Sequence, residues 1–233
     1  MRKYRKVLIV TGCAVLAMTV AVLLGRDREP YYRGRSLSKW LDVYCENVMT
    51  QHAPESTEAR QAIQAIGTNA VPFMLKWIRQ EPPSWGKSAY KKLPERVQDT
   101  AAGKFVMYGP GYERGFDAMN GFGALGTNGA SAVPELVALM RSTNLAATRA
   151  ITALAGIGAP AFPHLIAALS NTNQVARPYI ASLICVVAPY VGTNACLPAL
   201  GAALQDTDPA VRASAARAMK WLSPGTSTNA TAQ

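Results

Sequence analysis

The sequence contains few residues whose types and spacing could do chemistry, and the most suggestive pattern is glycine-rich. Residues 121–126 read Gly-Phe-Gly-Ala-Leu-Gly and match G-x-G-x-x-G. This pattern cradles a dinucleotide pyrophosphate when it joins a strand to the start of a helix. Here a helical pattern from Tyr112 leads into the glycines, so the required strand is missing. We therefore expect no bound cofactor.

Histidine and carboxylate side chains offer no better centre. His52 lies in a polar connector, and His164 follows a proline in what reads as the first turn of a helix. Neither has a serine, a cysteine or a group of acids positioned around it. Asp206 and Asp208 resemble a pair of catalytic carboxylates, but capping of a following helix explains them better. We expect no catalytic and no metal-binding residues, and a protein that is not an enzyme.

The cysteines leave one alternative open. Cys45, Cys185 and Cys196 lie outside the apolar N-terminal run, and none has metal-ligand spacing with a histidine. In an oxidising compartment Cys185 and Cys196 would be able to form a disulfide across a helix turn. The favoured interpretation is that both are small buried apolar residues.

The chain begins with features that are typical of a membrane anchor. Four Lys/Arg lie within residues 1–6, and no charged residue occurs at positions 7–24. Eighteen helical residues at about 1.5 Å each span about 27 Å, close to the thickness of a bilayer core. We predict a basic cytoplasmic stub at 1–6, a transmembrane signal-anchor at 7–25 and a linker at 26–35.

This charge asymmetry indicates a single-pass protein of a bacterial inner membrane with its body outside the cytoplasm. Export after signal-peptide cleavage, lipoprotein processing at Cys13 and a buried helix of a soluble protein remain alternatives. Residues 30–233 carry 18 Lys/Arg against 12 Asp/Glu without a long basic stripe. That distribution is a weak signal for nucleic-acid binding.

Internal repeats organise the rest of the chain. Four segments share a glycine, a short polar link and a proline: GTNAVP at 67–72, GTNGASAVP at 126–134, GAPAFP at 158–163 and GTNACLP at 192–198. Apolar residues recur two, three and six positions after each proline, with Gly201 as the one exception. This spacing marks one stripe of a helix. The residues are Met74, Leu75 and Ile78; Leu136, Val137 and Met140; Leu165, Ile166 and Leu169; Leu200, Gly201 and Leu204.

Each link predicts a helix, a tight turn and a second helix. The glycine tolerates positive φ at the end of a helix, and the Thr or Asn that follows in three links is able to cap the next helix. The proline then falls in the first turn, where its missing N–H is not needed. The intervals of 29 residues between Pro134 and Pro163 and 35 between Pro163 and Pro198 suit two-helix repeats.

One helix carries a recognisable signature. Asp208-Pro209-Ala210-Val211-Arg212 opens an alanine-rich helix, and Arg60, Arg149 and Arg177 fall at similar places in other units. This pattern resembles the HEAT repeat. The resemblance implies an all-α fold, a short right-handed α-solenoid of helical-hairpin repeats over 57–222 preceded by a transmembrane helix. The entry from Tyr32 to Leu41 resembles membrane-anchored or exported bacterial HEAT-repeat proteins of unassigned role.

Two segments depart from the repeat. We expect an N-terminal capping helix at 36–50, with Ser36 as its cap and an apolar face that packs on the first repeat. Residues 81–111 exceed one repeat and are rich in Pro and Gly, which predicts an inserted loop with a short helix around 95–104. A degenerate repeat is the alternative there. We expect residues 223–233 to form a disordered tail.

The resemblance and the composition favour a non-enzymatic protein–protein interaction scaffold, tethered to a membrane through residues 7–25. Its partner is expected to be another protein or peptide, with no nucleic acid and no small-molecule substrate. A nucleic-acid-binding HEAT-like array and a HEAT-like enzyme or lyase subunit are the alternatives. The first is opposed by residues 115–204, whose only basic residues are Arg141, Arg149 and Arg177. Neither the partner nor the binding face follows from the sequence.

Overall fold

The computed structural model describes residues 28–47, 54–109, 111–172 and 174–223. The predicted membrane anchor at 7–25 and His52 lie outside these residues, as does the tail from residue 224. Within the described ranges, no helix combines the length and apolar character that crossing a membrane requires.

Apart from turns, connecting segments and one short hairpin, the described chain is helical, which confirms the predicted all-α fold of the repeats. The strands of the hairpin are β1 (Tyr31–Tyr32) and β2 (Arg35–Ser36), which pair antiparallel. The helices are α2 (Leu37–Glu46), α3 (Pro54–Ile66), α4 (Val71–Ile78), α5 (Gly86–Tyr90), α6 (Glu95–Gln98), α7 (Ala101–Tyr108), α8 (Tyr112–Leu125), α9 (Val133–Met140), α10 (Leu145–Ile157), α11 (Phe162–Ser170), α12 (Arg177–Val191), α13 (Thr193–Ala203) and α14 (Pro209–Leu222), with 3-10 helices η2 (Gly67–Ala70) and η3 (Gly126–Ala132).

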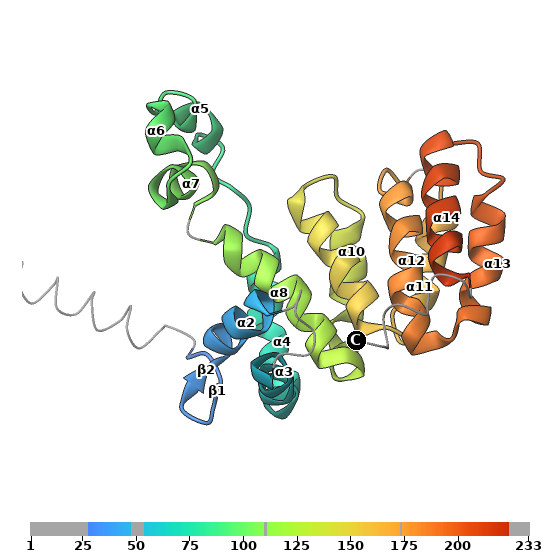
Figure 1. Ribbon diagram of the computed structural model, residues 1–233, viewed down its shortest axis with the longest axis horizontal. Coiled ribbons are helices and arrows are strands. Elements are labelled where there is room, and N and C mark those ends of the chain that lie inside the picture. The colour runs from blue at the N-terminus through green and yellow to red at the C-terminus, as the bar shows by residue number, and fades with distance from the viewer. Residues whose placement is uncertain (1–27, 48–53, 110, 173, 224–233) are drawn as a thin grey trace, which may run out of the picture.

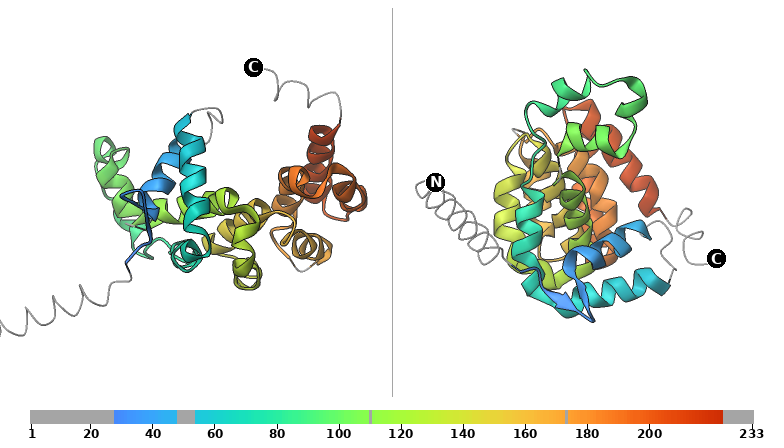
Figure 2. Two further views of the ribbon diagram at one scale, coloured as in Figure 1. Left: turned by 90° about the horizontal axis from the view of Figure 1, so that it is seen from below. Right: turned by 90° about the vertical axis from the view of Figure 1, so that its left-hand side faces the viewer.

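The helices form an elongated stack of hairpins. Figures 1 and 2 show it running from α2 and α3 at one end to α13 and α14 at the other. Each second helix of a hairpin packs on the first helix of the next unit: α4 on α8, α9 on α10, α11 on α12 and α13 on α14. The first helices also contact one another in sequence, so every unit buries its apolar face against a neighbour.

The predicted turns are present at all four glycines. Gly67, Gly126, Gly158 and Gly192 have φ values of +61°, +55°, +81° and +86°, a region that favours residues without a Cβ. The predicted Thr or Asn caps after these glycines are wrong. In the first two links the chain continues as a 3-10 helix directly into the next α-helix. The N–H of Val71, for example, donates to the Thr68 carbonyl, so that amide already has a main-chain partner.

The predicted apolar stripe forms the core of the stack. The residue two positions after each proline is fully buried in every unit, with 0% exposure at Met74, Leu136, Leu165 and Leu200. The residue three positions after each proline is half-buried in three of the four units. The stripe therefore faces the next hairpin along its centre and reaches solvent along one edge.

Helix α2 caps the N-terminal end of the stack and packs on α3 and α8. Leu37, Trp40 and Leu41 on this helix are at most 1% exposed. The predicted side-chain cap at Ser36 is wrong, because its hydroxyl bonds the Ser38 hydroxyl at 2.9 Å. The carboxylate of Glu29 caps the helix instead, accepting the Ser38 N–H at 3.0 Å.

Residues 81–111, which we call the arm, differ from the predicted loop. They contain α5, α6 and α7, and α5 and α6 both pack on α7. Within the described part of the chain, these helices make no extensive packing with the repeats, and Figure 1 shows them projecting from the stack. The arm is therefore a small helical excursion between α4 and α8 and does not form a further layer of the solenoid.

A candidate binding groove at the root of the arm

A buried arginine joins the two points at which the chain enters and leaves the arm, which we call the root of the arm. Arg149 lies on α10 and is 2% exposed. Its Nη1 donates to the Gln80 carbonyl at 2.5 Å and to the Ile78 carbonyl at 3.4 Å, where the chain enters the arm. Its Nη2 donates to the Tyr112 carbonyl at 2.8 Å, where the chain leaves it. The planar fork of a guanidinium suits this task, because it directs several donors at fixed angles.

Two further contacts near Arg149 hold the root of the arm against α10. The Glu81 carboxylate accepts the N–H of Ala146 at 2.8 Å and so supplies a partner for an amide in the first turn of α10. Gly115 faces the Arg149 guanidinium so closely that a Cβ there would collide with it. Burial lowers the pKa of Arg149, and the nearby Glu81 opposes that shift. The root of the arm is thus fixed to the next repeat.

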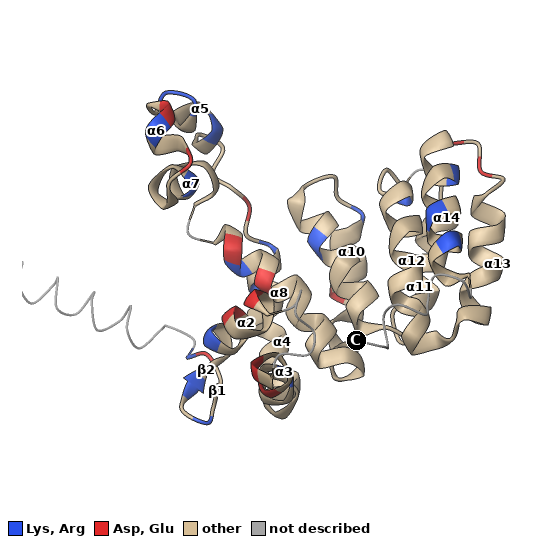
Figure 3. Cartoon of the chain, in the orientation of Figure 1, with Lys and Arg blue, Asp and Glu red and all other residues tan. Residues whose placement is uncertain are grey.

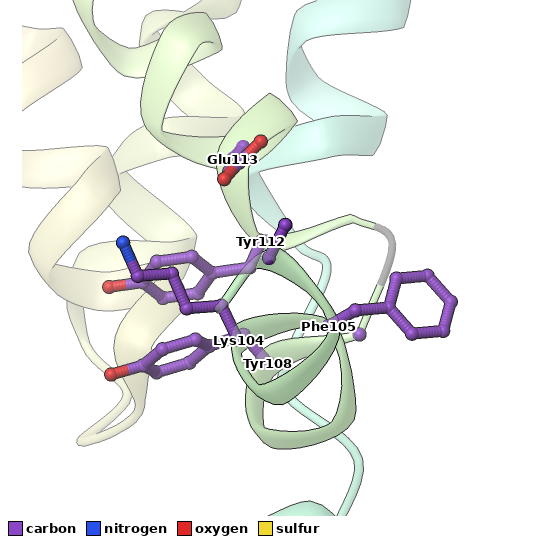
Figure 4. Close-up of a pocket in the computed structure, with 7 residues that line it drawn as sticks. Lys104, Phe105, Tyr108, Tyr112 and Glu113 are labelled. Atoms are coloured by element: carbon purple, nitrogen blue, oxygen red, sulfur yellow. The ribbon is translucent and has the colours of Figure 1, made fainter. Parts of the chain in front are cut away.

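An aromatic cavity lies where α7 meets α8. Tyr108 stacks on Tyr112 with 4.1 Å between ring centroids and 22° between ring planes, and the Arg149 guanidinium carbon lies 5.2 Å from the Tyr112 ring centroid. Figure 4 shows Lys104 extending beside the two tyrosines, with Phe105 pointing away from them. The cavity has a volume of about 700 Å³. Its lining consists of Ala101, Lys104, Phe105, Tyr108, Gly109, Tyr112 and Glu113.

A second cavity lies beside the first, between α8 and α2. Its volume is about 300 Å³, and it shares Tyr112 and Glu113 with the larger one. Its other lining residues are Asp42, Cys45, Glu46, Phe116 and Asp117. We call the two cavities together the groove. Its larger part is aromatic with one lysine, and its smaller part carries four carboxylates, counting Glu113.

One guanidinium partly balances these carboxylates. The Nη1 of Arg114 lies 2.6 Å from Asp42 Oδ1 and 3.7 Å from Asp117 Oδ2. Neither Glu46 nor Glu113 has an ion-pair partner among the described residues. The smaller cavity therefore has an excess of negative charge.

Burial and charge shift two pKa values in this cavity. Burial raises the pKa of Asp117, with Asp42 and Glu113 acting in the same direction and Arg114 against it. Burial, followed by the charge of Asp117, raises the pKa of the Cys45 thiol to about 12. The thiol is therefore protonated near neutral pH and is a poor nucleophile there. The groove is suited to binding through apolar contact and charge.

The residues considered from the sequence lie elsewhere. Gly121 and Gly123 belong to the interior of α8, where Gly121 contacts Leu41 of α2 and Gly123 faces Gly156 of α10, so close helix packing accounts for both. His164 is exposed in the first turn of α11. Within the described ranges, no three His, Cys, Asp or Glu side chains gather as metal ligands would.

The two aspartates have structural roles. Asp208 caps α14 by accepting the Ala210 N–H at 2.8 Å, as predicted. Asp206 forms an ion pair with the buried Arg177 at 2.5 Å, a contact that sequence reasoning missed. Cys185 and Cys196 are both free thiols in the structure.

Sequence reasoning also missed the groove. Lys104, Phe105 and Tyr108 follow an i, i+1, i+4 spacing, and Tyr112 and Phe116 extend it by further steps of four. This periodicity is typical of a helix, and it continues across the interval between the end of α7 at Tyr108 and the start of α8 at Tyr112. The Pro and Gly content of the arm obscured it.

Two family models match the C-terminal part of the chain. Residues 162–232 match a family model described as HEAT repeats, and residues 146–171 match one described as PBS lyase HEAT-like repeat. No curated protein matches the chain. Both matches begin beyond α9, so the groove lies outside the matched residues.

Proposed function

We propose that this chain, a HEAT-repeat protein, is a non-enzymatic scaffold that binds a segment of another protein in the groove at the root of the arm. The observation that carries this proposal is an aromatic cavity of about 700 Å³ that shares Tyr112 and Glu113 with an acidic cavity, on a root that a buried arginine fixes in place. Concave sites with aromatic walls and a few polar groups are typical places for recognition.

The distribution of charge supports a protein partner over a polyanion. Figure 3 shows Lys and Arg scattered over the arm and α14, while α11 and α13 carry neither basic nor acidic residues. Of the three basic residues at 115–204, Arg149 and Arg177 are buried. A nucleic acid needs a basic surface along its path, and these repeats do not offer one.

Photo-crosslinking in cells tests the proposal. Replacing Phe105, which lines the larger cavity, by benzoylphenylalanine places a photoreactive ring at the edge of the groove, and because Phe105 is 57% exposed the change does not disturb the core. We expect an adduct of discrete mass with a cellular protein. The control replaces Trp221, which is 70% exposed on α14 and remote from the arm. Equal adducts at both positions, or none at 105, would overturn the groove as the binding site.

We also propose that residues 7–25 anchor the chain in a bacterial inner membrane, with the repeats outside the cytoplasm. The support is the uncharged run at 7–24 and the four basic residues before it. A reporter fused after Gln233 should be active only if it is a type that functions outside the cytoplasm. Activity of a cytoplasmic reporter at that position would contradict the proposed topology.

A further inference from the structure

We propose that the groove selects a segment in which a lysine or arginine lies close to an aromatic or large aliphatic residue. This inference rests on the proposed function, because it names the chemistry of the protein segment that the groove binds. The apolar side chain would occupy the larger cavity and the cationic one the smaller.

The negative charge of the smaller cavity favours a ligand with a positive charge. Among the described residues, Asp42 and Asp117 share one guanidinium, that of Arg114, and Lys39 lies 3.9 Å from Asp42. Glu46 and Glu113 add two further carboxylates to the lining. A cationic side chain would relieve this excess, and the partial burial of Asp42 and Asp117 strengthens its attraction to these two carboxylates. An acidic segment would meet repulsion there.

The aromatic residues supply the second requirement. Phe105 and Phe116 are 57% and 51% exposed, although both line the groove. The Tyr108–Tyr112 stack offers further apolar surface in the larger cavity. Large apolar side chains left in water at a concave site gain free energy when a ligand covers them, at roughly 25 cal/mol per Å² of apolar area. Aromatic anchors of this kind dominate the affinity of many protein interfaces.

The wall that the two cavities share suggests a short spacing between the two side chains of the ligand. Tyr112 and Glu113 line both cavities, so the cavities are adjacent. Along α8, Tyr112 and Phe116 are one turn apart, about 6 Å. In an extended peptide, residues i and i+2 point to the same side and lie roughly 6.6 Å apart. An apolar residue and a basic residue separated by one position would therefore face the two adjacent cavities from the same side of the peptide.

Fluorescence anisotropy with defined peptides tests this specificity on the purified full-length chain in detergent. The probes are eight-residue Gly/Ser peptides that contain Phe-Gly-Lys, Lys-Gly-Phe, Phe-Gly-Glu or Ala-Gly-Lys. We expect one of the two Phe/Lys peptides to bind at least about tenfold more tightly than the last two. Raising the salt concentration should weaken that binding, because the carboxylates are partly exposed.

Charge variants locate the effect. Glu46→Gln with Glu113→Gln should reduce the preference for lysine over glutamate by about tenfold. The matched control, Glu55→Gln with Glu95→Gln, removes two exposed carboxylates outside the groove and should leave it unchanged. Phe105→Ala should weaken binding of every peptide that contains Phe.

The outcomes separate this inference from the proposed function. If lysine and glutamate peptides bind equally while Phe105→Ala weakens both, the charge specificity is wrong and the groove remains a binding site. A preference for the glutamate peptide would also overturn the inference. If no peptide binds and position 105 gives no crosslink in cells, both proposals fail.

Discussion

The N-terminal and C-terminal halves of the stack are built from the same helical hairpin, but they differ in the elements added to it. From α9 to α14 the hairpins follow one another with short turns, and five of the nine charged residues at 133–222 lie on α14 or are buried. From β1 to α8 the stack carries a capping helix, a hairpin, a projecting arm and most of the ion pairs. The groove lies in this irregular N-terminal half. Binding of a partner is therefore expected where the chain departs from the repeat.

Two arginines at similar places in the repeat show the difference at atomic scale. Arg177 on α12 binds the carboxylate of Asp206 in the turn before α14 and so ties neighbouring units of the regular part together. Arg149 on α10 binds three main-chain carbonyls at the root of the arm. A buried guanidinium at a similar repeat position thus joins two stacked units in one half and positions the arm in the other.

The largest expected effect concerns the regular half. Leu165 is 0% exposed between two neighbouring units, and Leu165→Ala should lower the free energy of unfolding by about 2–5 kcal/mol. The adjacent His164 is exposed, so His164→Ala should change stability by less than about 1 kcal/mol. Urea denaturation of the full chain, followed by circular dichroism, measures both. A neutral Leu165→Ala beside a severe His164→Ala would mean that the stripe is misassigned.

The next effect concerns the root of the arm. Arg149→Ala leaves three carbonyls without their donor, and an unpartnered buried polar group costs about 1–3 kcal/mol. Water will replace part of the loss, so we expect about 3 kcal/mol in total and faster proteolysis within residues 81–111. Arg212→Ala is the matched control, because Arg212 is exposed and should contribute less than about 1 kcal/mol. Unchanged proteolysis of the arm would show that Arg149 does not hold its root.

The sequence predicted the regular half well for a physical reason. Its signals are local: glycine at the turn, proline in the first helical turn and apolar residues at helical spacing, as at Gly158, Pro163 and Leu165. The groove depends on contacts between distant residues, such as Arg149 with Gln80 and Arg114 with Asp42. No local pattern encodes these pairings, and the helices of the arm are short, with the prolines of the arm lying in the segments outside them.

A smaller effect distinguishes two helical glycines. The Gly156 position on α10 lies so close to Gly123 of α8 that an added Cβ would be 2.8 Å from its backbone. Gly156→Ala should therefore cost about 1–3 kcal/mol through overpacking. Gly201 on α13 has nothing within 4 Å of that position, and Gly201→Ala should stabilise the protein by roughly 0.5–1 kcal/mol through helix propensity. Thermal melting of both variants checks the opposite signs.

The smallest expected effect is a difference in pH dependence between the two halves. A hydrogen bond from the Asp208 N–H, and then the neighbouring Arg177, hold the pKa of Asp206 below its ordinary value. Burial holds the pKa of Asp117 in the groove above its ordinary value. In the folded state Asp206 therefore binds its proton less readily than in the unfolded chain, and Asp117 binds it more readily.

Linkage then gives the two groups opposite signs. The contribution of Asp206 is fully present above its unfolded pKa, near 3.9, and is lost as the pH falls through its lower folded value. The contribution of Asp117 runs the other way: the folded state gains stability as the pH falls from its raised pKa toward 3.9. Melting temperatures of the wild type, Asp206→Asn and Asp117→Asn, measured between pH 7 and pH 3, separate these effects. The difference between wild type and Asp206→Asn should shrink toward pH 3, whereas acidification should raise the wild type relative to Asp117→Asn. Parallel curves for the three proteins would show that neither carboxylate is shifted, and that the two halves do not differ in this respect.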